Sequence, residues 1–106
     1  MINQPFFIWD DRKYVKINLN EIMVLKSEDN YLRFLAQEYS YQVRATLDRT
    51  LSLLPDNLFV RIHKSYAVSL HHLEEVEKDV VKIGGLSLPV SKKFYGELIS
   101  RLNVIR

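Results

Sequence analysis

Three basic residues in the segment 58–70 have the chemistry to bind an anion or the edge of a nucleic-acid base: Arg61, His63 and Lys64. Arginine and lysine donate hydrogen bonds to phosphate oxygens or to the O6 and N7 acceptors of guanine, and histidine donates or accepts according to its protonation. No acidic residue lies between Asp56 and Glu74, so no neighbour along the chain neutralises this positive charge.

Lys64 has the wrong phase for the strand that its neighbours predict. Val60, Ile62 and Val68 share one face of a period-two pattern, and Lys64 falls on the same face. A buried ammonium is costly. The pattern therefore predicts a turn or bulge near residues 63–65 that directs Lys64 outward.

A second cationic site is predicted at the start of a C-terminal helix. If Ser91 is the N-cap, Lys92 and Lys93 lie in the first turn, where the helix dipole disfavours cations. An anion bound there would face free backbone N–H groups, the helix dipole and two ammonium groups. Two solvated surface lysines are the alternative, and these residues alone do not decide between the two.

Other candidates have simple structural explanations. Asn30 and Tyr31 follow an acidic loop; asparagine can pair with adenine and tyrosine can lie against a sugar or base, but asparagine in a turn most often serves the backbone. Arg44 precedes an internal helix and is either a phosphate contact or a solvated side chain. A salt bridge across the sheet would explain Arg61, and a half-buried imidazole would explain His63.

The sequence lacks the patterns of catalytic and metal sites. His71 and His72 are adjacent and no HExxH pattern includes them, while Ser65 near His63 lacks a G-x-S-x-G elbow. The glycines form no phosphate loop, and there is no cysteine. We expect no enzymatic activity, no metal and no cofactor.

Composition indicates one globular domain over residues 1–106, with 47% apolar and 26% charged residues. The net charge of +2 does not by itself indicate a protein that binds polyanions, so the distribution of charge along the chain matters more. Four acids lie between two basic windows that contain none, which suggests a basic face and an acidic edge: Glu74, Glu75, Glu77 and Asp79. No apolar run approaches the roughly 20 residues of a membrane span, and we expect a soluble, cytoplasmic protein.

Short strands dominate the predicted elements. Alternating or fully apolar stretches predict strands at 6–9, 13–17, 21–27, 31–37, 39–44, 58–70 with a turn, 75–78, 80–83 and 86–90. Helical spacing predicts a helix within 45–54, capped by Thr46, and another after Ser91. The expected fold is mainly β and mostly antiparallel, with one internal and one C-terminal helix.

Two motifs, in order, resemble the LytTR family of bacterial DNA-binding domains. They are FVRIHKSYAVS at residues 59–69 and LPVSKKFYGEL at residues 88–98; weaker support comes from residues 22–34 and 43–47. The resemblance implies an elongated β domain of about ten short strands in small antiparallel sheets. Ser69 departs from the family's usual asparagine, and Lys26, Ser27 and Asp29 depart from its pattern in the first loop.

The resemblance also implies that loops, rather than a recognition helix, enter the DNA grooves. The implied base contacts are Asn30, Lys64 and Lys92. Phosphate or supporting contacts would be Tyr31, Arg44, Arg61, His63, Ser91 and Lys93.

Our hypothesis is a sequence-specific binder of double-stranded DNA, acting at direct-repeat promoter sites as the output module of a two-component response regulator. Its further partners would be a receiver domain or a second copy of the chain, and no membrane. The alternative is a β-rich protein-interaction module that uses three aromatic residues expected to be exposed, Trp9, Tyr39 and Tyr41.

Overall fold

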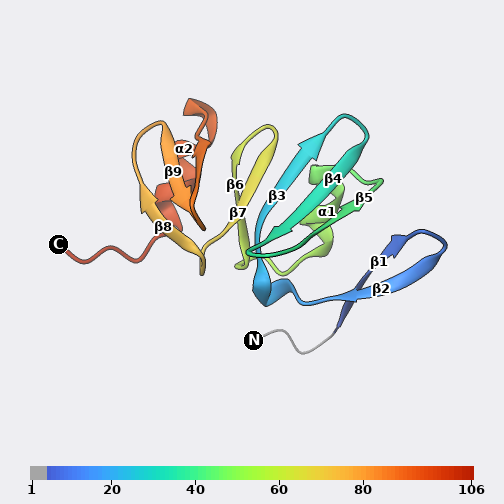
Figure 1. The fold of residues 1–106 in the computed structure, drawn as a ribbon. Coiled ribbons are helices and arrows are strands. Elements are labelled where there is room, and N and C mark those ends of the chain that lie inside the picture. Colours follow the sequence, from blue (N-terminus) through green and yellow to red (C-terminus); the bar gives the residue numbers. More distant parts are fainter. Residues whose placement is uncertain (1–4) are drawn as a thin grey trace.

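A computed structural model describes residues 5–106 of the chain. These residues form ten strands in three antiparallel sheets, with two α-helices and one short 3-10 helix, in an elongated body of 48 × 30 × 25 Å (Figure 1). The elements are β1 (Phe6–Asp10), β2 (Lys13–Ile17), η1 (Leu19–Glu21), β3 (Ile22–Glu28), β4 (Tyr31–Ala36), β5 (Ser40–Val43), α1 (Leu47–Leu53), β6 (Phe59–His63), β7 (Tyr66–Ser69), β8 (Leu73–Val76), β9 (Val80–Ile83), β10 (Leu86–Pro89) and α2 (Lys92–Ser100). The predicted mainly β, elongated fold with one internal and one C-terminal helix is confirmed.

The central element is a five-stranded sheet in the order β5-β4-β3-β7-β6. One face, which includes Leu25 and Phe34, packs against α1 and the β1–β2 hairpin. The other face, which includes Val24 and Val68, packs against α2 and the C-terminal sheet of β8, β9 and β10. Strand β3 contributes to both cores, as its continuous apolar run predicts.

The turns follow local sequence signals. The predicted N-terminal hairpin forms, and its turn falls at Asp11 and Arg12, which both have positive φ angles of 48° and 64°. Two such residues in succession match the tight turn that suits the twist of a hairpin. Gly84 and Gly85 likewise take positive φ angles between β9 and β10.

The interruption predicted near residues 63–65 is confirmed. The pairing of β6 with β7 shifts register between Arg61 and His63, and residues 64–65 form the turn. Lys64 lies at its tip and is exposed, whereas Ile62 is fully buried. The bulge and turn therefore allow Ile62 to be buried and Lys64 to be exposed, although both fall on the apolar face of the period-two pattern.

Both helices begin at the predicted residues, but their caps differ. The Thr46 hydroxyl accepts a hydrogen bond from the Arg49 amide at 3.2 Å. Ser91 occupies the predicted N-cap position of α2, but its side chain makes no cap bond. The Phe94 amide donates instead to the backbone carbonyl of Ser91 at 3.0 Å, which satisfies the donor that the hydroxyl would have served.

Strand β8 begins at Leu73, earlier than predicted. Leu73 and Val76 are half-buried while Glu74 and Glu75 are exposed, because a register shift after Leu73 lets both apolar residues face the core.

Among residues 5–106 there is no helix with the length and hydropathy needed to cross a bilayer.

Candidate nucleic-acid interface

Two turns that carry predicted contacts lie next to each other at one end of the five-stranded sheet. Strand β3 pairs with β7 so that Lys26 opposes Tyr66, and the Ser27 amide donates to the Ser65 carbonyl at 2.8 Å. The β3–β4 turn at residues 29–30, called the Asn30 turn, therefore neighbours the β6–β7 turn at residues 64–65, called the Lys64 turn. We refer to the end of the five-stranded sheet where these turns lie as the Lys64 end (Figure 1, top).

The start of α2 is attached to the same end. The Ser91 amide donates to the Ile62 carbonyl at 2.8 Å, and α2 packs along β6. Lys92 and Lys93, both exposed, follow directly in the first turn of the helix. The structure thus brings the two cationic sites found in the sequence to a shared edge, although they are far apart in the chain.

Arg44 lies at the Lys64 end on the opposite flank. Val43, its neighbour, pairs with Leu32 at the start of β4, close to the Asn30 turn. Arg44 is exposed, and so are Asn30 and Tyr31, of which Tyr31 keeps 40% of its accessible surface. Asp29 has a positive φ of 53°, so the Asn30 turn takes a tight conformation at a residue other than glycine.

Arg61 is occupied by contacts within the protein. Its Nε donates to the His63 carbonyl at 3.1 Å, a second nitrogen donates to the Lys64 carbonyl, and a third pairs with Asp48 of α1. The guanidinium also lies 5.5 Å from the centre of the Phe94 ring. The salt bridge expected across the sheet is instead one to a helix, and the Arg61 side chain is only 24% exposed.

His63 shapes the Lys64 turn with one ring nitrogen and leaves the other available. Its Nδ1 accepts a hydrogen bond from the Ser65 amide at 3.1 Å. A neutral imidazole that accepts at Nδ1 carries its proton on Nε2, which makes Nε2 a donor for an incoming acceptor. The ring lies 5.6 Å from that of Tyr66 and is half-buried.

Lys92 and Lys93 differ in their surroundings. The Lys93 ammonium lies 5.4 Å from the centre of the Phe94 ring, close to the aromatic ring that Arg61 also contacts. Among residues 5–106, Lys64, Lys92 and Lys93 form no ion pair. Exposed ammonium groups that lie at one end of the sheet and form no ion pair within the described residues are suited to bind an anion.

The negative charge of Glu28, beside the Asn30 turn, is neutralised by two basic side chains, and one of these pairs could not be predicted from the sequence. Glu28 pairs with Lys26 at 3.1 Å and with Arg33 at 3.3 Å. The hydrogen bond from Lys26, followed by the charges of Lys26 and Arg33, lowers the pKa of Glu28 below its usual value. Only the pairing of β3 with β4 brings Arg33 to this position, so sequence spacing gave no signal for it.

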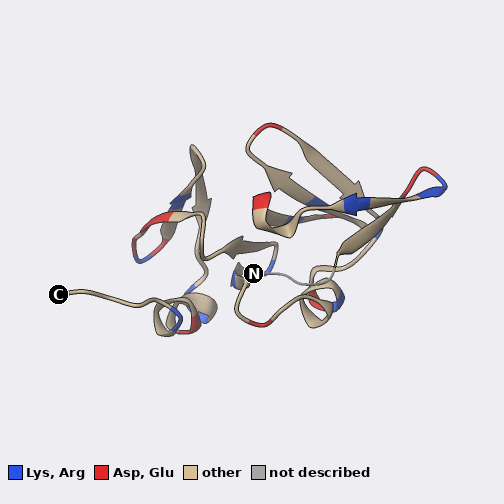
Figure 2. Ribbon diagram, turned by 90° about the horizontal axis from the view of Figure 1, so that it is seen from below, with Lys and Arg blue, Asp and Glu red and all other residues tan. Residues whose placement is uncertain are grey.

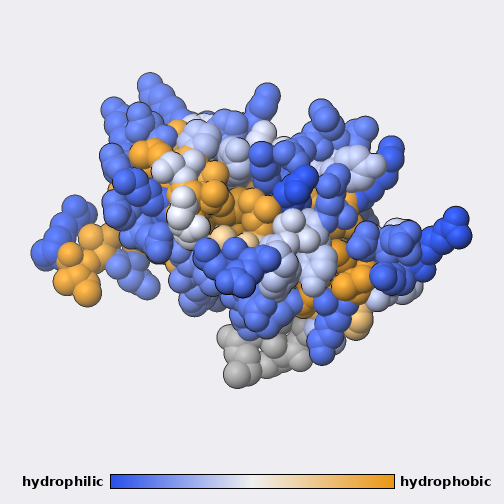
Figure 3. All heavy atoms as spheres, in the orientation of Figure 1, coloured by the Kyte–Doolittle hydropathy of each residue, from blue (hydrophilic) through white to orange (hydrophobic). Residues whose placement is uncertain are grey.

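The predicted separation of a basic face from an acidic edge holds only in part. Lys82 lies directly opposite Glu75 in the pairing of β8 with β9 on the C-terminal sheet. The acidic β8–β9 turn borders the start of α2, since the Asp79 carbonyl accepts a hydrogen bond from the Val90 amide at 3.0 Å. Figure 2 shows acidic residues in this turn, and Figure 3 shows hydrophilic side chains along the upper edge.

The three aromatic residues of the alternative hypothesis do not form one exposed surface. Trp9 is 55% exposed and packs edge-on against Tyr14 in the N-terminal hairpin. Tyr41 is half-buried against the core, contrary to expectation, because its position on β5 faces α1 and the hairpin. Tyr39 donates its hydroxyl hydrogen to Glu21, which raises the pKa of Tyr39 to about 12.

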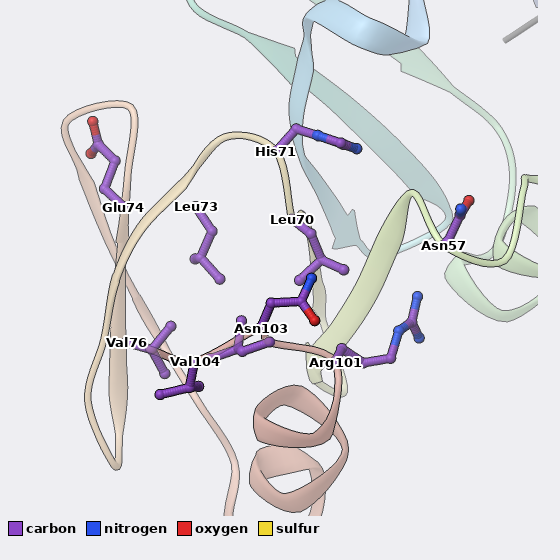
Figure 4. A pocket seen from close by; sticks show the side chains of 10 residues that line it. Asn57, Leu70, His71, Leu73, Glu74, Val76, Arg101, Asn103 and Val104 are labelled. Atoms are coloured by element: carbon purple, nitrogen blue, oxygen red, sulfur yellow. The ribbon is translucent and has the colours of Figure 1, made fainter. Parts of the chain in front are cut away.

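A groove of about 740 Å³ lies at the other end of the five-stranded sheet (Figure 4). Its lining includes Asn57, Leu70, Leu73, Val76, Arg101 and Val104. Asn57 precedes β6 and Leu70 follows β7, so the groove lies opposite the Lys64 turn. The predicted contacts are not part of it. In the described range, 5–106, no three histidine or acidic side chains gather in a way that would hold a metal ion.

This arrangement defines the class of protein. It is a β domain that presents basic side chains at one end, from the turns of its central sheet and from the first turn of α2. A family model for the LytTr DNA-binding domain matches residues 12–103, and the chain belongs to this family. The resemblance inferred from the two motifs is thereby confirmed. This family is defined by DNA binding and not by catalysis.

Known proteins agree with this assignment. The chain is 26% identical over 96 residues to the sensory transduction protein LytT of Bacillus subtilis, covering 85% of this chain and 40% of that protein. It is 34% identical over 85 residues to an uncharacterized response regulatory protein of Vibrio cholerae, covering 72% of this chain and 33% of that one. The chain thus spans well under half the length of these curated relatives.

A solved structure has the same fold. It is a LytTr DNA-binding domain from Bacillus cereus, with a TM-score of 0.80 at 20% identity, and the match covers 94% of this chain and 97% of that one. At this level of identity the likeness concerns the fold alone.

Proposed function

We propose that this chain acts as one domain that binds double-stranded DNA in a sequence-specific manner through the Lys64 end. The observation that supports the proposal is that three separate segments, the Asn30 turn, the Lys64 turn and the start of α2 with Lys92 and Lys93, lie at the same end of the sheet. The Lys64 turn, the Asn30 turn and the start of α2 are the loops that would enter the grooves.

Base edges would be read by the side chains at the tips of the turns. Lys64 and Lys92 are suited to the O6 and N7 acceptors of guanine, and Asn30 to the paired donor and acceptor of adenine. Lysine lacks the bidentate fork of arginine, so we expect softer discrimination for guanine than arginine would give. His63 would donate from Nε2, the nitrogen that the Ser65 amide leaves available.

Phosphate groups would be bound by residues that surround these proposed base contacts. Arg44, Lys93, Tyr31 and Ser91 lie at the Lys64 end with exposed or half-exposed polar groups. Each neutralised phosphate releases counterions, and bending of the duplex would add selectivity for deformable sequences. No enzymatic step is part of this function.

The wider role we propose is that of an output module in a bacterial, cytoplasmic transcriptional regulator. The relatives named above include a response regulatory protein and a sensory transduction protein, and both are longer than this chain. We propose that a receiver domain or a second copy of the chain acts together with this domain, and that two copies occupy direct repeats so that two small interfaces combine.

Selection of bound duplexes from a randomised pool, followed by a salt titration on the selected site, tests the proposal. With roughly five phosphate contacts, the slope of log affinity against log salt should lie near −4 to −5. Failure to retain any duplex, or a flat salt dependence, would refute DNA binding and favour a role in protein interaction. The repeat spacing in the selected pool tests the direct-repeat arrangement.

A further inference from the structure

Arg61 stands apart from the other cations of the Lys64 end because its donors are already engaged. The guanidinium contacts two successive backbone carbonyls of the Lys64 turn region, those of His63 and Lys64, and also the carboxylate of Asp48. A guanidinium has five N–H donors in a rigid planar fork, and a lysine ammonium cannot reproduce this arrangement.

The contacts join three elements that are separate in the sequence. Asp48 lies in the first turn of α1, the two carbonyls border the β6–β7 turn, and Phe94 lies in the first turn of α2. We call Arg61, Asp48 and the two carbonyls the Arg61 clamp. Its partners differ in exposure, since the Asp48 side chain is 82% exposed and that of Arg61 only 24%.

The clamp also engages two carbonyls of the turn within the protein, since those of His63 and Lys64 both accept hydrogen bonds from Arg61. Carbonyl oxygens carry partial negative charge and would repel phosphate. With the oxygens of His63 and Lys64 turned toward Arg61, the Lys64 side chain at the tip remains exposed. The register shift between Arg61 and His63 interrupts the regular pairing of β6 with β7 just before this turn, and the bonds of Arg61 add to those that Ser65 makes there.

We infer that Arg61 is a positioning residue that fixes the conformation of the Lys64 turn and does not itself neutralise a phosphate. Asp48, an acid at an end that binds a polyanion, has the complementary role of holding Arg61 in place. This inference rests on the proposed DNA binding and adds to it a division of labour: Arg61 orders the turn, and Lys64 makes the contact.

The test compares Arg61→Lys and Arg61→Gln with a matched control, Lys93→Gln, in the full chain. Affinities for a selected duplex and for a random duplex are measured over a range of salt. The clamp predicts that both Arg61 variants lose about tenfold or more in affinity for the selected duplex. The salt slope and the affinity for the random duplex should stay as in the unmodified chain.

Lys93→Gln should behave differently, with weaker binding to both duplexes and a salt slope smaller by about 0.9. The inference is overturned if Arg61→Gln shows this same pattern, or if Arg61→Lys retains full affinity for the selected duplex. A general structural role would lower the melting temperature without changing the ratio of selected to random affinity well below that temperature, and this result would also overturn it.

Asp48→Ala is a second test, because the clamp and simple electrostatics predict opposite changes in DNA affinity for this variant. Removing a negative charge near a polyanion should strengthen binding, as we expect for the control Glu77→Ala, an exposed acid on the β8–β9 turn. The clamp predicts instead a loss of roughly threefold or more on the selected duplex alone. Strengthened binding by Asp48→Ala would overturn the inference. If the unmodified chain retains no duplex, the proposed function itself fails.

Discussion

The two ends of the five-stranded sheet use their polar side chains in different ways. At the Lys64 end, the backbone is held by hydrogen bonds such as those of Ser27 to Ser65 and Ser91 to Ile62, while Lys64 and Lys92 are exposed. At the opposite end, polar side chains bind other parts of the protein. Tyr39 donates to Glu21 there, and Arg101 donates to the Asp56 carbonyl.

The difference separates stability from binding. A polar side chain that serves the fold finds a partner within it, because an unmet donor or acceptor forgoes the free energy of that bond. A cation that the fold leaves exposed, on a backbone that the fold holds firmly, is available for an external anion without a large cost in conformational entropy. At the Lys64 end, Arg61 and Glu28 bind partners within the protein, whereas Lys64 and Lys92 are cations of this second kind. The predictions below test the contrast between these exposed cations and the polar side chains of the opposite end.

The largest effect is expected for Lys64→Ala. Loss of a base contact should reduce affinity for the selected duplex by about 1 to 3 kcal/mol and relax specificity at one position. Because Lys64 is exposed at a turn, the melting temperature should stay unchanged. Binding assays on the selected site and on single-base variants of it measure the effect.

The control for Lys64→Ala is Lys82→Ala, which removes an exposed lysine that lies opposite Glu75 on the C-terminal sheet. We expect little change in affinity from this control. If Lys64→Ala instead unfolds the domain, Lys64 has a structural role and the contrast between the ends is wrong.

A smaller and less specific effect is expected for Lys93→Gln. A lost phosphate contact should weaken binding to all duplexes alike and reduce the salt slope by about 0.9. The Lys93 ammonium also lies over Phe94, so calorimetry should accompany the titration to separate lost packing from lost charge. An unchanged slope would remove Lys93 from the set of phosphate contacts.

Much of the fold follows from local signals in the sequence. The apolar run from Ile22 to Leu25 predicts a strand buried on both faces, and the phase of Lys64 predicts the turn that exposes it. Both signals depend on neighbours along the chain, so no knowledge of the tertiary structure was needed. The two motifs then supplied the family, and through it the sets of implied contacts.

What the sequence could not supply depends on register and on docking between elements. The pairing of Arg61 with Asp48 requires α1 to pack beside β6, and the burial of Tyr41 requires the N-terminal hairpin to cover β5. Lys82 looked like part of a basic window until the pairing of β8 with β9 placed it opposite Glu75. Long-range geometry decides each of these cases.

At the opposite end, Arg101→Ala should affect stability alone. Arg101 donates to the Asp56 carbonyl and pairs with Glu97 at 3.5 Å, so it joins the end of α2 to the segment before β6. Its removal should lower the free energy of unfolding by about 1 kcal/mol, mostly through the hydrogen bond to the carbonyl. Denaturant titration measures the loss. A change in DNA affinity well below the melting temperature would contradict the separation of the two ends.

The smallest effect concerns the bond between Tyr39 and Glu21. This bond raises the pKa of Tyr39 to about 12, above the ordinary value near 10 that the unfolded chain would show. The bond therefore contributes its full stability below about pH 10, and the contribution is lost as the pH rises toward 12, because the unfolded chain gives up the phenolic proton first. Ultraviolet titration of tyrosinate should show one tyrosine ionising late.

In Glu21→Gln, that late ionisation should move toward the ordinary value, since the negative charge beside the Tyr39 hydroxyl is removed. Tyr39→Phe should abolish it and so identify the residue. Neither change should alter DNA affinity near neutral pH, because η1 and the β4–β5 turn lie at the end of the sheet away from Lys64. A shift in DNA affinity from Glu21→Gln would show that the two ends are coupled through β3, the strand that joins them.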